Sequence, residues 1–89
     1  MDFEWDPGKA AGNFDKHRVE FADSTMVFYD DLAVTLPDET ADEERFVTLG
    51  MDAVGRLLVV AYTWREERIR IISARRATGR ECRAYEGKP

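Results

Sequence analysis

The sequence predicts an α+β fold, in which two N-terminal helices pack on a mainly four-stranded antiparallel sheet and a short C-terminal helix follows the last strand. Two observations support this prediction. The hydrophobic period changes from helical to alternating near residue 32, and the later apolar segments are joined by hairpin-length connections. The 89 residues suffice for one core, since a domain of this size buries roughly 60–65% of its unfolded surface. We therefore expect residues 1–89 to form a single domain.

The N-terminal half reads as a weak strand followed by two helices. Residues 2–5 (DFEW) alternate weakly and are compatible with a short edge strand. Asp6 and Pro7 form a helix-start signal, because Asp caps helices well and Pro is tolerated at the first helical position. This helix is expected to run to about Lys16. A second helix is expected over residues 21–28, where apolar side chains recur three and four positions apart.

The C-terminal half contains four predicted strands and a capped helix. Strands are expected over residues 32–36, 45–50, 57–63 and 68–74, separated by an acidic loop (37–44) and by turns at 51–56 and 64–67. The third of these strands is apolar on both faces, which is typical of a central strand. Thr78 and Glu81 have the spacing of a capping box, so a short helix is expected to begin there and to run to about Glu86.

Charge is divided unevenly along the chain. Residues 1–44 hold three Lys/Arg against thirteen Asp/Glu, and residues 45–89 hold ten against five, so the halves carry −10 and +5. The net charge of −5 therefore conceals a basic face, although it disfavours direct binding to duplex DNA. The N-terminus lacks the apolar region of a signal peptide, the longest apolar run has six residues, and Cys82 is the only cysteine. We expect a cytoplasmic protein without a membrane segment.

Arginines gather around the last predicted strand. Arg75 and Arg76 precede the capped helix, Arg80 lies in its first turn, and Arg65 lies in the turn before the strand. Helix N-termini favour anions, and guanidinium groups bind phosphate in a fixed fork geometry. We expect Arg65 and Arg75 to face one phosphate. The alternative is that these are ordinary solvated arginines that pair with nearby acidic residues, namely Glu66, Glu67, Glu81 and Glu86.

Two segments carry a resemblance to a known family. Residues 3–21 (FEWDPGKAAGNFDKHRVEF) resemble the opening of BrnT-type toxins, which read F-x-W-D-x-x-K and then N-x-x-K-H-x-V-x-F. Residues 68–81 (RIRIISARRATGRE) resemble their closing segment, R-I-R-I-I-S-A-R-x-A-T-x-x-E. The resemblance covers nearly the whole chain. It implies a RelE-like fold, a ribonuclease that blocks translation, and a BrnA antitoxin that binds DNA through a ribbon-helix-helix domain. The toxin would then contact DNA only through that partner, which we expect to cover the basic face.

One position departs from the family pattern. Many members read T-E-R before the last strand, whereas this chain has Thr63, Trp64 and Arg65. If a glutamate there assists catalysis in relatives, Glu66 or Glu67 would have to substitute for it. The departure leaves open a non-catalytic or weakly active module that acts mainly as antitoxin partner and co-repressor. A small RNA-binding protein without cleavage is a third possibility.

RNA cleavage by the 2′-OH needs charge stabilisation at the phosphorane, a base and an acid, but no metal. Arginines suit the first role. Histidine is the residue type whose unperturbed pKa suits acid–base work near neutral pH, so His17, the only histidine, is a candidate, although it could equally cap the end of the first helix. The candidate catalytic residues are Arg65, Arg75, His17 and Arg80.

Candidate RNA contacts come from the same region. Trp64 could stack on a base or contact the antitoxin, Arg76 could bind the RNA backbone, and Tyr85 could stack or donate a proton. The alternative for Tyr85 is to anchor the last helix to the sheet. The acidic residues between 30 and 44 lack the spacing of a calcium loop, and Cys82 has no Cys or His neighbour for zinc. We expect no metal and no cofactor.

Overall fold

The predicted order of helices and strands is present in the computed structural model, which describes residues 1–39 and 42–87. Thr40 and Ala41 of the predicted acidic loop lie outside the described residues. The fold is a mixed α+β fold. Its elements are β1 (Asp2–Glu4), α1 (Pro7–His17), α2 (Phe21–Ser24), the 3₁₀ helix η1 (Thr25–Tyr29), β2 (Val34–Pro37), β3 (Phe46–Met51), β4 (Leu57–Arg65), β5 (Arg68–Arg76) and α3 (Gly79–Glu86).

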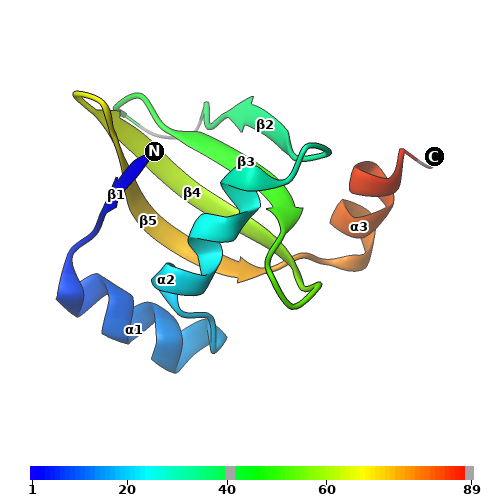
Figure 1. Ribbon diagram of the computed structural model, residues 1–89, viewed down its shortest axis with the longest axis horizontal. Coiled ribbons are helices and arrows are strands. Elements are labelled where there is room, and N and C mark those ends of the chain that lie inside the picture. The colour runs from blue at the N-terminus through cyan, green and yellow to red at the C-terminus, as the bar shows by residue number, and fades with distance from the viewer. Residues whose placement is uncertain (40–41, 88–89) are drawn as a thin grey trace.

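The sheet has five strands in the order β1-β5-β4-β3-β2 (Figure 1). Strands β2 to β5 form the predicted antiparallel meander. The prediction of a mainly four-stranded antiparallel sheet was incomplete, because β1 adds a fifth strand parallel to β5, with Phe3 opposite Ile69. The weak alternation of residues 2–5 indicated a strand but carried no information about its distant partner.

Local chemistry explains how the two N-terminal helices begin and end. The Asp6 carboxylate accepts a hydrogen bond from the Lys9 backbone N–H at 2.9 Å, as expected of an N-cap. Arg18, in the left-handed conformation, ends α1. The single second helix predicted over residues 21–28 is α2 continued by η1. The Ser24 hydroxyl donates to the Phe21 carbonyl at this junction, and such back-bonding competes with regular α-helical hydrogen bonds.

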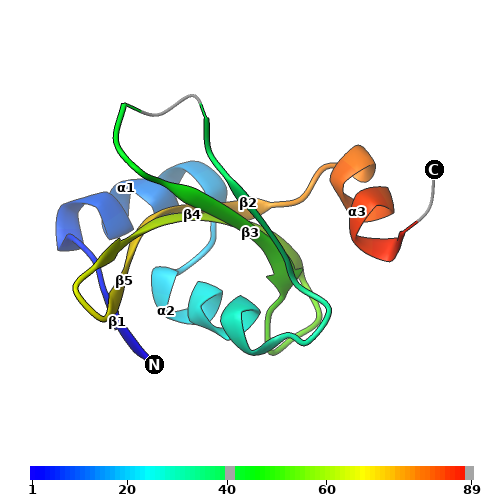
Figure 2. The ribbon, with the colours of Figure 1, turned by 90° about the horizontal axis from the view of Figure 1, so that it is seen from above.

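The core lies between the sheet and the α2–η1 segment, which covers one face of it (Figures 1 and 2). Phe28 packs edge-on against Tyr62, with ring centroids 4.9 Å apart. Helix α1 is fixed to β5 by the buried Asn13, whose amide donates to the Ala74 carbonyl and accepts from the Ala74 N–H. The largest fully buried hydrophobic side chains are Phe21, Leu58, Ile69, Ile71, Val19, Val27 and Val60.

Helix α3 lies apart from this core. It projects from the end of the sheet (Figure 1) and contains no buried residue. The predicted capping box is confirmed, since the Glu81 N–H donates to the Thr78 hydroxyl and the Thr78 N–H donates to the Glu81 carboxylate. The short helix predicted after the last strand is therefore present, and most of its residues are exposed. Among the described helices, none has the length and apolarity needed to span a membrane.

Candidate functional site

Four cationic side chains from four parts of the chain line one hollow of about 240 Å³. Lys9 comes from α1, Arg45 from the segment before β3, Arg65 from the end of β4 and Arg70 from β5. We call this hollow the basic pocket. Its lining is completed by Glu43, Thr63, Trp64 and Ile72.

The β4–β5 hairpin sets the position of the arginines. Arg65 pairs with Arg68, and Thr63 pairs with Arg70. Because side chains alternate across a sheet, Thr63, Arg65 and Arg70 point to the same face. The predicted turn at residues 64–67 is shorter than expected, since β4 runs to Arg65 and β5 begins at Arg68. Glu66 adopts a positive φ of 58°, which closes this tight turn.

Ion pairs leave part of the positive charge in the basic pocket unmatched. Arg70 is held by Glu4, with Nη1 2.7 Å from Oε2, and Arg45 lies 3.7 Å from Glu43. Lys9 and Arg65 form no ion pair with any residue that the structure describes. The buried Nε of Arg45 also lacks a hydrogen-bond partner within the described chain. An anion in the pocket would meet two unpaired cations and an unused donor, so the site suits a phosphate.

Arg75 has a different environment at the far end of β5. Its guanidinium donates to both oxygens of Glu81, at 2.8 and 2.9 Å. The hydrogen bonds from Arg75 lower the pKa of Glu81 to about 2, and the same bonds raise the pKa of Arg75. Arg75 therefore fastens the first turn of α3 to the sheet. The alternative in which this arginine pairs with a nearby glutamate is confirmed.

Arg65 and Arg75 do not face one phosphate, as the sequence had suggested. Arg65 lies opposite Arg68 at the start of β5, whereas Arg75 lies opposite Val59 near its end. Seven residues separate Arg68 from Arg75, which corresponds to about 23 Å along an extended strand. The prediction failed because it placed Arg65 before the last strand and Arg75 just after it, and the length of that strand separates the two residues.

The remaining predicted residues are also divided between the two ends of the sheet. Trp64 is 48% exposed and lines the basic pocket. Arg76 and Arg80 are exposed at the end where α3 begins. His17 is half-buried as the last residue of α1, one turn beyond the Asn13 bridge to β5. Thus only Trp64 and Arg65 of the predicted residues line the basic pocket.

Tyr85 fits its alternative role as an anchor. Its hydroxyl donates to the Asp30 carboxylate at 2.5 Å, across 55 positions of sequence. This hydrogen bond raises the pKa of Tyr85 to about 12 and lowers the pKa of Asp30. Asp30 also accepts the Met51 N–H at 2.8 Å. Tyr85 thus attaches the last turn of α3 to the body of the protein.

Three of the four cationic residues that line the basic pocket were not identified from the sequence. Lys9, Arg45 and Arg70 come from distant parts of the chain, and no local pattern shows that the fold brings them together. A signal for Lys9 was present, since it is the lysine of F-x-W-D-x-x-K. The same motif places Asp6 at the helix cap, so one short segment starts α1 and aims its first turn at the pocket.

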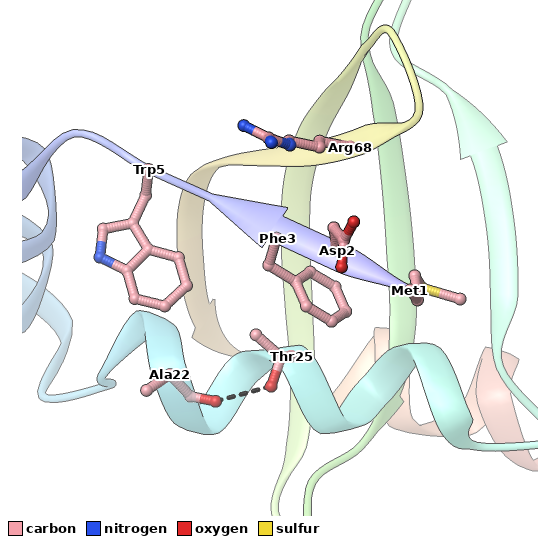
Figure 3. Close-up of a pocket in the computed structure, with 7 residues that line it drawn as sticks. All are labelled: Met1, Asp2, Phe3, Trp5, Ala22, Thr25 and Arg68. Carbon is pink, nitrogen blue, oxygen red and sulfur yellow. Dashed lines mark hydrogen bonds between the residues drawn. The ribbon is translucent and has the colours of Figure 1, made fainter.

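The two aromatic residues of that motif, Phe3 and Trp5, pack against the helices. Phe3 lies 5.4 Å from the Phe28 ring and Trp5 lies 6.1 Å from the Phe21 ring, measured between centroids. Figure 3 shows both side chains between β1 and the helix that carries Ala22, beside an open hollow of about 520 Å³. Arg68 is the only lysine or arginine that lines this hollow among the described residues, whereas four such residues line the basic pocket.

Comparison with known proteins defines the class of protein to which this fold and pocket belong, the toxins of toxin–antitoxin systems. A family model described as "Ribonuclease toxin, BrnT, of type II toxin-antitoxin system" matches residues 5–81. The chain therefore belongs to the BrnT family of ribonuclease toxins, as the resemblance of its motifs predicted. It is similar to the crystal structure of the Brucella abortus ribonuclease toxin BrnT, with a TM-score of 0.70 and 27% identity, over 88% of this chain and 97% of that one. No curated protein matches the chain.

Proposed function

We propose that this toxin cleaves RNA in the basic pocket without a metal ion, by attack of a ribose 2′-OH on the adjacent phosphate. One observation carries the proposal: Lys9, Arg45, Arg65 and Arg70 converge on a hollow that is also lined by an exposed tryptophan. Negative charge accumulates on the phosphorane during such a reaction, and pre-positioned cations stabilise it strongly. Trp64 offers a stacking surface for a neighbouring base.

The pocket also contains groups suited to proton transfer. Glu43 is the carboxylate in its lining and is the general base in this proposal. In the proposed step, Glu43 accepts the 2′-OH proton and the 2′-oxygen forms a bond to phosphorus. The bond from phosphorus to the 5′-oxygen breaks, and Lys9 gives that oxygen a proton. The products are a 2′,3′-cyclic phosphate and a free 5′-OH. Glu66, in an adjoining hollow with Arg65, is the competing base.

The wider biology follows from family membership and charge. We propose that residues 1–89 form a single RelE-like toxin domain that acts in the cytoplasm and inhibits translation. A BrnA-like ribbon-helix-helix antitoxin would neutralise it and carry the DNA contacts. The net charge of −5 supports the proposal that the antitoxin, and not the toxin, binds DNA, because phosphate neutralisation supplies most of the affinity for duplex DNA.

A cleavage assay with purified toxin tests the mechanism. The expected result is cleavage of RNA in excess EDTA, with cyclic phosphate ends, and no cleavage of a matched oligonucleotide that has 2′-deoxyribose at the cut site. Glu43→Gln should slow cleavage by about 10²-fold or more, and Glu66→Gln should not. Cleavage that stops in EDTA and returns with added magnesium would refute the metal-free mechanism.

Trp64 favours a second candidate function, in which the chain is a weak or inactive enzyme that serves as antitoxin partner and co-repressor. Trp64 occupies the position of the glutamate in T-E-R, and a tryptophan cannot accept a proton there. Trp64→Glu restores the family pattern. A large gain in cleavage for Trp64→Glu over an almost inactive wild type would favour this second function. Binding of RNA without cleavage by either protein would favour a simple RNA-binding role.

A further inference from the structure

A second surface, formed by the α2–η1 segment and the β3–β4 turn, has a different composition. Two adjoining hollows of about 300 and 250 Å³ share Met26, Asp52 and Ala53. Val54 lines the first hollow, and Tyr29 and Met51 line the second. We call the two hollows together the acidic groove. Neither contains a residue of the basic pocket.

The acidic groove exposes large apolar side chains. Val54 is 79% exposed, Tyr29 56%, Met26 41% and Met51 38%. Exposed apolar groups that gather in one place mark interaction surfaces more often than single exposed residues do. Methionines adapt their shape to a partner's side chains, so two of them in one groove suit the docking of a protein segment.

The charge of the groove specifies the partner. Asp23, Asp30 and Asp52 line it, and no lysine or arginine does so among the described residues. Arg56 lies beside it and pairs with Asp52 at 2.7 Å and with Asp23 at 3.6 Å, which leaves an excess of negative charge. Electrostatic complementarity therefore calls for a partner with basic residues around its apolar anchors.

We propose that the antitoxin docks in the acidic groove through a basic amphipathic helix. Apolar side chains three or four positions apart on that helix would fill the two hollows, and flanking Lys or Arg would face Asp23 and Asp30. The proposal rests on the toxin function only in naming the partner as the antitoxin. This docking site differs from the basic face that the sequence led us to expect the antitoxin to cover, because the basic pocket shares no residue with the groove.

Binding of the antitoxin encoded beside the toxin gene provides the test. The double variant Met26→Glu/Val54→Glu should weaken its affinity by about 100-fold or more in calorimetry, a loss typical of buried anchor residues. RNA cleavage and the thermal melt should stay at wild-type values. The matched control is Leu36→Glu, which alters an equally exposed apolar residue on β2 and should leave the affinity within about twofold. Leu36 alternates with Thr35, whose hydroxyl contacts the inward-facing Thr48, so it points to the opposite face of the sheet.

A charge variant tests the nature of the partner. Asp23→Lys should weaken binding and reduce its dependence on salt, because one attractive contact becomes repulsive. Wild-type affinity of the Met26→Glu/Val54→Glu variant would overturn the proposal. So would self-association of the toxin alone that this variant abolishes, since the groove would then bind a second copy of the chain. A wild type that cuts no RNA but binds the antitoxin through the groove would refute the proposed function and leave the docking site intact.

Discussion

The Arg75 guanidinium donates hydrogen bonds of 2.8 and 2.9 Å to the two oxygens of the Glu81 carboxylate, and these bonds join the end of β5 to the first turn of α3. Glu81 also completes the capping box of that helix with Thr78. Because α3 buries no residue of its own, these polar contacts and the Tyr85–Asp30 hydrogen bond hold it in place. Three residues of the family's closing motif therefore form one structural unit, namely Arg75, Thr78 and Glu81.

Acid should weaken the attachment of α3. The pKa of Glu81 is about 2 in the folded protein against 4.5 in the unfolded chain, so its stabilising effect is complete above pH 4.5 and disappears as the pH falls toward 2. Glu81→Gln removes the charge but keeps a residue that can form the capping box. We expect this variant to lose about 1–2 kcal/mol in urea unfolding at neutral pH, after allowance for solvent screening. The difference from wild type should vanish near pH 2, and a constant difference would contradict the assignment.

Arg65 and Arg75 should give opposite results in mutagenesis. Arg65→Ala removes an unpaired cation from the basic pocket and should slow RNA cleavage by about 10²–10³-fold with an unchanged melt. Arg75→Ala should lower the melting temperature, because it removes the ion pair with Glu81 that attaches α3 to the sheet. Arg80→Ala is the control for exposed charge at the α3 end, and it should match wild type in both assays. Equal loss of cleavage in the Arg65 and Arg80 variants would argue against the basic pocket.

Mutation of Asp52 should lower the free energy of unfolding more than mutation of any other carboxylate. Its side chain is 2% exposed and accepts hydrogen bonds from the Val54 N–H, the Arg56 N–H and the Arg56 Nε. Burial alone would raise the pKa of Asp52, yet the hydrogen bonds from Arg56 and Val54 hold it below its usual value. Asp52→Ala leaves a partly buried guanidinium and two backbone donors unpaired, and should cost about 3 kcal/mol in urea unfolding. A cost within about 0.5 kcal/mol would show that the turn does not depend on this network.

Alkaline titration should identify the Tyr85 anchor. The pKa of Tyr85 is raised from 10.0 to about 12 by its hydrogen bond to Asp30. The stabilising effect of this bond is therefore complete below pH 10 and is lost as the pH rises toward 12. We expect the ultraviolet difference titration between wild type and Tyr85→Phe to show a phenolate that forms well above pH 10. A midpoint at pH 10 would mean that the bond does not persist in solution.

Local signals in the sequence were sufficient for most helix and strand positions. The Asp6 cap with Pro7 and the Thr78–Glu81 capping box act within three or four residues, and both formed as predicted. The four-strand meander followed from alternation and short connections. In contrast, the parallel pairing of β1 with β5 joins residues that are 66 positions apart, and no local pattern specifies such a pair.

Only a small part of the candidate site was predictable from the sequence, for the same reason. Trp64 and Arg65 are adjacent in the sequence, and both were predicted as site residues because they occupy the T-E-R position of the family pattern. Lys9 and Arg70 reach the same pocket because α1 lies along β5, a contact made by the buried Asn13. The role of Arg75 was predicted wrongly because the strength of an ion pair depends on geometry. From the sequence, its partner Glu81 was one of four equally plausible glutamates.

The parallel pairing of β1 with β5 also bears on the order of events during synthesis. Glu4, from the first few residues, holds Arg70 in the pocket wall, and Lys9 faces residues that are made much later. Contacts between such distant positions form late, because the loop between them must close first. A ribosome that is still producing the last third of this chain therefore carries no assembled pocket. The basic pocket can therefore assemble only after β5 has been made and the N-terminal strand has docked beside it.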